Sequence, residues 1–184
     1  MNNSQVTDES LSQSTGSDLA RLAAGLLFLA VVLGFSFYFV GPSSNQLFLA
    51  IAAVFGGYMA MNIGANDVAN NVGPAVGSKA MTMGWAIVIA MIFEASGAII
   101  AGGDVVSTIK KGIIDIEAFG ENTDHFTWAM MAALLAAALW LNLATWARAP
   151  VSTTHSIVGG VMGAGIAAEG FSIVDWATMA KIAS

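Results

Sequence analysis

Long apolar stretches separated by short polar breaks dominate the chain. No charged residue occurs in residues 22–66, a run of 45 residues, and a helix needs about 20 apolar residues to cross a hydrocarbon core of roughly 30 Å. The turn residues at 41–45 divide this run, so the pattern predicts membrane spans near 21–40 and 46–63. Later apolar runs predict spans near 80–103 and 127–147, with one sizeable loop at 104–126. The chain is therefore expected to be an all-α, polytopic membrane protein.

Two segments depart from this pattern. Residues 157–170 are short for a full crossing and contain five glycines, so we expect a re-entrant helical hairpin that enters and leaves one face. Residues 1–20 are rich in Ser, Thr, Asn and Gln and have little apolar surface to bury. They predict a disordered polar tail, followed by a transmembrane domain over 21–184.

Composition agrees with a membrane protein and excludes several other classes. Hydrophobic residues make up 57% of the chain and charged residues only 10%, with a mean hydropathy of +0.74. A formal net charge of −6 argues against nucleic-acid binding, which needs a basic face. The absence of cysteine removes thiolate metal sites and thiol nucleophiles, and two histidines make zinc chemistry a poor hypothesis. We expect no enzyme and no cofactor.

The densest group of oxygen donors is Asn66, Asp67, Asn70 and Asn71. Residues three and four apart share a face of a helix, so Asp67 can lie beside the amides that follow it. One carboxylate with several amide carbonyls suits a hard monovalent cation, and Gly64, Gly73 and Pro74 are typical of an interrupted helix that leaves backbone groups facing a cavity. The alternative is a polar loop at the membrane surface.

A second polar group follows Pro150 and consists of Ser152, Thr153, Thr154, His155 and Ser156. It precedes a Gly-rich helical stretch, as the N-terminus of a helix would. Free N–H groups and a partial positive charge make such an end a good site for phosphate or sulfate. The alternative is simple capping, in which Ser152 or Thr153 holds the first turn.

Glu94 lies near the middle of the third apolar run. A carboxylate there costs on the order of 3 kcal/mol unless it is paired, hydrated or protonated. It predicts either a hydrogen bond to a neighbouring helix or a coupling or gating residue on a water-filled path. Gly159, Gly160, Gly163 and Gly165 are best interpreted as close helix packing.

Four segments, in this order, resemble segments of the inorganic phosphate transporter family, the PiT/PHO4 group. They are 64–82, beginning Gly-Ala-Asn-Asp, 93–98 (Phe-Glu-Ala-Ser-Gly-Ala), 103–115 (Gly-Asp-Val-Val-Ser-Thr-Ile-Lys-Lys-Gly-Ile-Ile-Asp) and 150–159 (Pro-Val-Ser-Thr-Thr-His-Ser-Ile-Val-Gly). The resemblance covers about residues 46–184. It implies one half of an inverted-repeat transporter, with broken helices and a re-entrant hairpin. Because each motif occurs once, we expect the N-terminal half, truncated before the second repeat.

The resemblance also implies roles for the candidate residues. Asn66, Asp67 and Asn70 would form a sodium site. Ser152, Thr153 and Thr154 would bind phosphate with His155 beside them, and Glu94 matches a family acid regarded as important for transport, in line with a coupling or gating role.

The function expected is secondary active transport of inorganic phosphate, as sodium-coupled symport by alternating access, with the sodium ion as co-substrate. The alternatives are a proton- or metal-coupled phosphate or sulfate permease of the same family and, in another class, a non-transporting structural or sensory membrane subunit. Expected partners are phosphate, sodium or a proton, the lipid bilayer, the missing C-terminal half of the same chain and, as an open alternative, a homo-oligomer; nucleic acid is not expected. We expect an integral membrane protein in the plasma (inner) membrane of a prokaryote.

Overall fold

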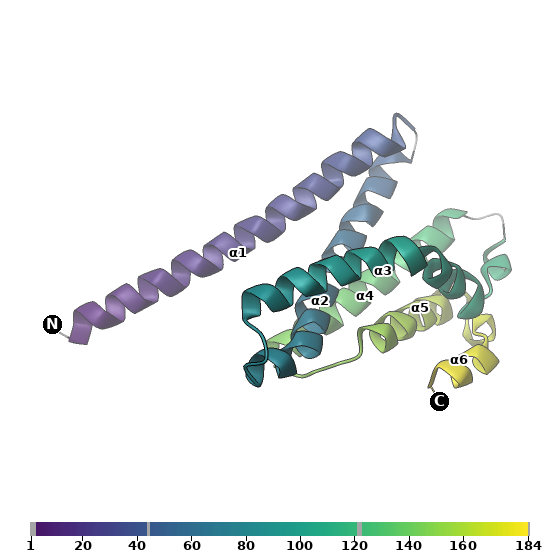
Figure 1. The fold of residues 1–184 in the computed structure, drawn as a ribbon. Helices are drawn as coiled ribbons and strands as arrows, with labels where there is room; N and C mark the ends of the chain where they lie inside the picture. The colour runs from purple at the N-terminus through teal and green to yellow at the C-terminus, as the bar shows by residue number, and fades with distance from the viewer. Residues whose placement is uncertain (1–2, 44, 121–122, 184) are drawn as a thin grey trace. The chain divides into compact units, whose positions relative to one another are not determined.

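A computed structural model describes residues 3–43, 45–120 and 123–183. The elements within these residues are all helical, as Figure 1 shows, and the predicted all-α fold is confirmed. They are α1 (Asn3–Val40), α2 (Gln46–Gly77), α3 (Met83–Gly112), η1 (Ile116–Phe119), α4 (Thr123–Trp146), α5 (Thr153–Glu169), η2 (Phe171–Ile173) and α6 (Trp176–Ala183), where η denotes a 3-10 helix.

Four of these helices, within the described residues, are long and apolar enough to cross a membrane. Their candidate spans are Gly16–Val40, Gln46–Gly77, Met83–Ser107 and Asp124–Trp146, so the four predicted spans are confirmed in number and place. Helix α5 has 17 residues and is about 26 Å long, which is short of a roughly 30 Å core. The chain is an integral membrane protein.

The polar segment 64–74 is helical, which corrects one prediction. Helix α2 runs without a break from Gln46 to Gly77 and includes Pro74, whereas we expected the second span to end near residue 63. A helix already begun gains one hydrogen bond for each residue added, and one glycine costs only about 1 kcal/mol. The helix ends a turn after Pro74, where Lys79 takes a left-handed conformation (φ 63°).

Helix α1 begins at Asn3 and continues through the polar segment into the apolar one. Residues 3–20, for which composition predicts a disordered tail, thus form the first part of this helix. The physical reason is the same as in α2, because a helix extends from a formed turn far more easily than it starts.

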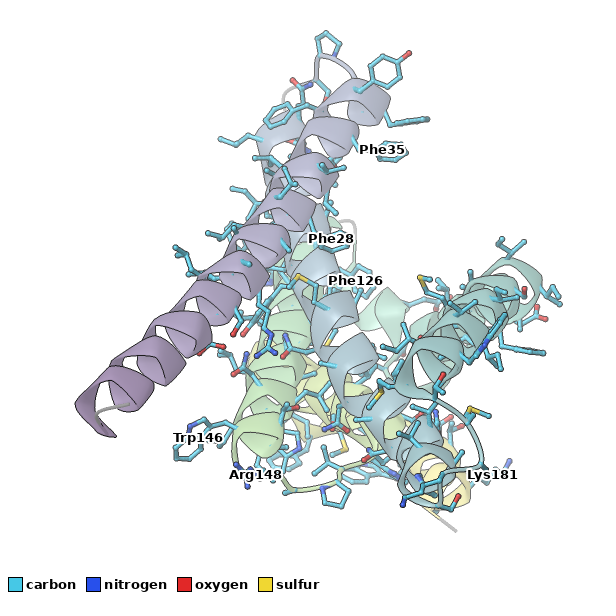
Figure 2. The ribbon with its side chains drawn as sticks, turned by 60° about the vertical axis from the view of Figure 1, so that its left-hand side comes forward. Phe28, Phe35, Phe126, Trp146, Arg148 and Lys181 are labelled. Carbon is cyan, nitrogen blue, oxygen red and sulfur yellow. The ribbon has the colours of Figure 1, made fainter. Side chains whose placement is uncertain are left out.

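The chain forms two compact units, residues 1–57 and 58–184. In the first unit, α1 and the start of α2 are joined at Gly41, whose φ of +66° favours glycine. The Gln46 side-chain amide donates to the Phe37 carbonyl (3.1 Å) across this turn. Phe28 and Phe35 project from α1 with exposed side chains (Figure 2).

In the second unit, α5 folds back alongside α4 (Figure 1). The helices approach closely at Gly160, where an added Cβ would lie 2.8 Å from the Ala133 carbonyl oxygen. An added Cβ at Gly165 would lie 2.9 Å from the Ile114 Cγ2 atom, whereas at Gly159 and Gly163 none of the described residues comes within 4 Å of an added Cβ. The packing interpretation is therefore confirmed for Gly160 and Gly165, and within the described residues it does not hold for Gly159 and Gly163.

Two apolar clusters hold the second unit together. Small residues of α4 take part in both, which lets the neighbouring helices approach. The first cluster comprises Ile113, Ile114, Phe119, Ala129, Ala133, Val158, Val161, Ile173 and Val174. The second comprises Met59, Ala137, Ala138 and Leu141, so it brings α2 against α4.

The connection between α3 and α4 is shorter than the loop expected at 104–126, because α3 continues to Gly112. An antiparallel bridge, Ile114 with Val174, ties it to the connection between α5 and α6. The Asp115 N–H donates to the Ile173 carbonyl (2.9 Å), and the Asp175 N–H donates to the Ile113 carbonyl (3.1 Å). This bridge fixes the end of α5 opposite the candidate site.

Candidate functional site

One face of α2 carries polar residues at every fourth position: Tyr58, Asn62, Asn66 and Asn70. Residues four apart lie above one another on a helix. The Asn62 Nδ2 atom donates to the Tyr58 carbonyl (2.9 Å), and the Asn70 Nδ2 atom donates to the Asn66 Oδ1 atom (3.0 Å). Asn62 and Asn66 are buried at 7% and 5% exposure, whereas Asn70 is exposed, so the middle of this polar face is turned into the protein.

Helix α4 contacts this face through two polar side chains. The Asn66 Nδ2 atom donates to the Thr145 Oγ1 atom (3.3 Å), and the Asn142 Nδ2 atom donates to the Tyr58 hydroxyl (3.1 Å). Both contacts join residues about 80 positions apart in the chain. They place the last turns of α4 beside the middle of α2.

The start of α5 contacts the same part of α2. The Thr153 Oγ1 atom donates to the Asp67 Oδ2 atom at 2.7 Å, and Thr153 is buried at 7% exposure. This short bond has the length expected for a hydroxyl and a carboxylate. The structure therefore brings the candidate cation cluster and the candidate anion segment into direct contact.

Ser152 caps the first turn of α5. Its hydroxyl accepts from the His155 N–H (3.2 Å), and the Ser156 hydroxyl donates to the Ser152 carbonyl (2.7 Å). The capping interpretation thus holds for Ser152, whereas Thr153 bonds to Asp67 instead. The remaining N–H groups of a first turn have no partner within their own helix, so Thr153 and Thr154 still offer backbone donors. Thr154 and His155 are exposed.

Two open cavities follow the line where α2 meets α4, and both are bordered by Ala65 and Thr145. One has a volume of about 370 Å³ and is lined further by Tyr58, Met61, Asn62, Asn142 and Trp146. The other has a volume of about 310 Å³ and is lined further by Asn66, Ala69, Asn70, Arg148, Ala149 and Pro150. Trp146 and Arg148 lie together at the end of α4 (Figure 2).

The donors around Asp67 are suited to a monovalent hard cation. They are the Asp67 carboxylate, the Thr153 hydroxyl bonded to it and the amide oxygens of the neighbouring residues Asn66 and Asn70 in α2, all of which are oxygen ligands. No group of three or more His, Cys, Asp or Glu side chains suited to a metal ion occurs in the described residues. The arrangement therefore does not resemble a transition-metal centre.

The structure leaves two of the singled-out residues outside this cluster. Asn71 is exposed on α2, and Glu94 is exposed near the middle of α3. Among the described residues, no hydrogen bond or ion pair joins Glu94 to another side chain. Its coupling or gating role stays a prediction.

Four site residues were not recognised from the sequence: Tyr58, Asn62, Asn142 and Thr145. The regular spacing of Tyr58, Asn62, Asn66 and Asn70 in an apolar helix is a signal that would have found the first two. Asn142 and Thr145, three residues apart on α4, carry a weaker form of the same signal. Their pairing with α2 requires the tertiary structure.

Comparisons of this chain with known proteins all find phosphate transporters or permeases. Residues 63–184 match the model of the phosphate transporter family. A Helicobacter pylori (strain J99) protein named "Putative phosphate permease" is 55% identical over 168 residues, which cover 91% of this chain and 31% of that protein. A Haemophilus influenzae protein of the same name is 46% identical over 132 residues, covering 72% of this chain and 31% of that protein.

A solved structure described as "The sodium-dependent phosphate transporter" is also similar. It has a TM-score of 0.67 and 45% sequence identity, and the match covers 72% of this chain and 33% of that one. The chain spans about a third of the length of these relatives.

Proposed function

The chain belongs to the phosphate transporter family, and from this premise we propose that it forms part of a sodium-coupled phosphate symporter. Asn66, Asp67 and Asn70 hold the sodium ion. Ser152, Thr153 and Thr154 hold phosphate, with His155 beside them. The protein works by alternating access, with the site at the meeting of α2, α4 and α5, in the plasma membrane of a prokaryote.

One contact carries the proposal. The Thr153 hydroxyl and the Asp67 carboxylate lie 2.7 Å apart, so an anion that binds Thr153 lies within a few ångströms of a carboxylate. Like charges at that distance repel strongly where water is scarce. A sodium ion at Asp67 offsets this repulsion, so each ligand favours binding of the other, as linkage requires.

The anion side of the site is supported by the start of α5. Hydroxyl groups and first-turn N–H groups are donors without net charge, and the positive end of the helix dipole favours an anion. The cation side is supported by the amides of α2, of which Asn66 is buried and Asn70, one turn further along, is bonded to it. Half-helices and helix ends meeting at a polar site are typical of secondary transporters.

Substitution of Asp67 tests the sodium site. We expect Asp67→Asn to raise the sodium concentration for half-maximal phosphate uptake roughly 10-fold or more, because charged contacts are worth about 1.5–3 kcal/mol. The measurement is uptake of labelled phosphate by the complete protein in proteoliposomes, with and without a sodium gradient. Asn71→Ala is the matched control, since Asn71 is an exposed amide on the same helix.

The outcomes are distinct. Normal sodium dependence in Asp67→Asn would contradict the assignment of the sodium site. If uptake by the unaltered protein responds to a proton gradient alone, the coupling ion is a proton and not sodium. Glu94 and His155 then become the candidate proton carriers. Competition by sulfate as strong as that by unlabelled phosphate would contradict phosphate as the specific substrate, and absence of any uptake would favour a non-transporting subunit.

A further inference from the structure

We propose that Arg148, which lies just after the end of α4 (Figure 2), binds the phosphate anion at an entrance to the site, before the anion reaches the start of α5. The proposal rests on the proposed function and adds to it the place where the anion arrives. Arg148 belongs to neither of the segments proposed to hold sodium and phosphate.

One of the two open cavities between α2 and α4 carries a positive charge. Its volume is about 310 Å³, and Asn66, Asn70 and Arg148 are among its lining residues. Arg148 is the one charged side chain among the described residues of this lining. An anion in the cavity therefore meets an opposite charge and no lining carboxylate, whereas a cation meets a like charge.

The cavity adjoins the candidate site through two segments of the chain. Asn66 directly precedes Asp67, whose carboxylate accepts the hydrogen bond from Thr153. Pro150 also lines the cavity and is three residues before Thr153, in the segment that leads into α5. An anion held at Arg148 is therefore next to the segment proposed to bind phosphate.

The Arg148 side chain is available to bind an anion. It is exposed, and none of the described carboxylates forms an ion pair with it. A guanidinium group has five N–H donors in a planar fork, which suits the oxygen atoms of phosphate. The Thr145 hydroxyl, which also lines the cavity, accepts from Asn66 (3.3 Å) and keeps its own hydrogen, so the lining contains a further donor.

The backbone of Arg148 has a conformation that favours glycine. Helix α4 ends in a Schellman motif, in which the Ala149 N–H donates to the Ala144 carbonyl (2.8 Å). Arg148 occupies the left-handed position of this motif (φ 55°), where glycine is usual because it has no Cβ atom. Strain of this kind supports a functional hypothesis when it occurs at a site, and here the charged cavity is that site.

Lys79 provides a matched control. It takes the same place at the end of α2 (φ 63°), where the Ala80 N–H donates to the Ala75 carbonyl (3.0 Å). Lys79 does not line the cavity and lies nine residues beyond Asn70. The strained backbone is common to both basic residues, so a Lys79 variant shows the effect of losing one positive charge at such a helix end without changing the cavity.

The experiment measures the phosphate KM for uptake by the complete protein, at saturating sodium, in proteoliposomes of phosphatidylcholine. For Arg148→Gln we expect this KM to rise about 3- to 10-fold at low ionic strength, between the effects of an exposed ion pair and of a charged hydrogen bond. Choline chloride at about 0.5 M should reduce the difference, because salt screens exposed charges. Arg148→Lys keeps the charge and should lie closer to the unaltered protein, and Lys79→Gln should match it.

The sodium requirement gives a second readout. At saturating phosphate, the sodium concentration for half-maximal uptake in Arg148→Gln should stay near that of the unaltered protein. A general disturbance of the site should raise both the phosphate KM and the sodium requirement, whereas loss of an anion contact should raise the phosphate KM alone.

Several results would overturn the proposal. They are an unchanged phosphate KM in Arg148→Gln, an equal rise in Lys79→Gln, and a difference that salt does not reduce. A difference that appears only in vesicles containing phosphatidylglycerol would show that Arg148 binds the phosphate of a lipid headgroup instead. Arg148→Gly removes the charge at a position that favours glycine, so it gives the decision if the glutamine variant does not fold. If the unaltered protein takes up no phosphate, the proposed function itself fails before any variant is compared.

Discussion

The approach of α5 to α4 at Gly160 gives a sharp prediction about stability. Replacing Gly160 with Ala puts a Cβ atom 2.8 Å from the Ala133 carbonyl oxygen and 3.5 Å from the Ala137 Cβ atom. The nearer atom belongs to the backbone of a helix, so it cannot move aside as the tip of a long side chain could. Either α5 shifts away from α4 or the contact remains strained.

The size of the effect follows from two opposing terms. Overpacking a well-packed contact costs about 1–3 kcal/mol, whereas replacing Gly by Ala inside a helix favours the folded state by about 0.8–1 kcal/mol. Gly159→Ala receives only the second term, since none of the described residues has an atom within 4 Å of an added Cβ there. The free energies of unfolding of these neighbouring variants should therefore differ by about 1–3 kcal/mol, with Gly160→Ala the less stable.

The assay is thermal unfolding of both variants and the unaltered protein in the same detergent. For a chain of this length, the expected difference corresponds to about 2–12 °C in Tm between the two variants. Because the substitutions are chemically identical and adjacent, the comparison cancels general effects of a Gly to Ala change. Equal Tm values for Gly160→Ala and Gly159→Ala would refute the close approach of α4 and α5 described above.

Two further predictions concern helix starts. The Ser152 hydroxyl caps α5, so Ser152→Ala should cost about 1 kcal/mol and lower Tm by about 2–4 °C in the same assay; an unchanged Tm would show that the cap contributes nothing. At the start of α6, hydrogen bonds from the Thr178 N–H and hydroxyl lower the pKa of Asp175. Because the pKa is lowered, the ionised Asp175 side chain stabilises the start of α6 at pH values above its ordinary pKa of 3.8. This stabilisation is lost as the pH falls through the lowered pKa. The Thr178 amide NMR shift should follow this titration and lose it in Asp175→Asn, and an identical titration in that variant would contradict the cap.

Much of the architecture could be predicted because membrane spans are a local property. Twenty apolar residues fix a crossing whatever surrounds them, and the four spans lie where the apolar runs do. The prediction that the second span ends near residue 63 was wrong because it considered only local helix propensity. Gly64, Gly73 and Pro74 weaken a helix locally, but they do not outweigh the continuous hydrogen bonding of α2.

Candidate ligands were also visible in the sequence, since Asp67 and the hydroxyls after Pro150 are polar residues in an apolar chain. Their relation to each other was not. Asp67 and Thr153 are 86 positions apart, and the positions of Asn66 and Thr145 differ by 79. Spacing along a chain carries no information about such pairs, because they depend on how α2, α4 and α5 pack.

Helix α5 also shows which features are set by the local sequence and which depend on tertiary packing. The sequence by itself determined that α5 is short, Gly-rich and capped by a hydroxyl, because length, composition and capping are set by neighbouring residues. Only the tertiary structure decided that Gly160 meets Ala133 while none of the described residues comes within 4 Å of an added Cβ at Gly159, since the face that is buried depends on the partner helix. It likewise decided which hydroxyl caps the helix and which one binds Asp67, because a hydroxyl can donate to a carboxylate only when another helix brings that carboxylate within reach.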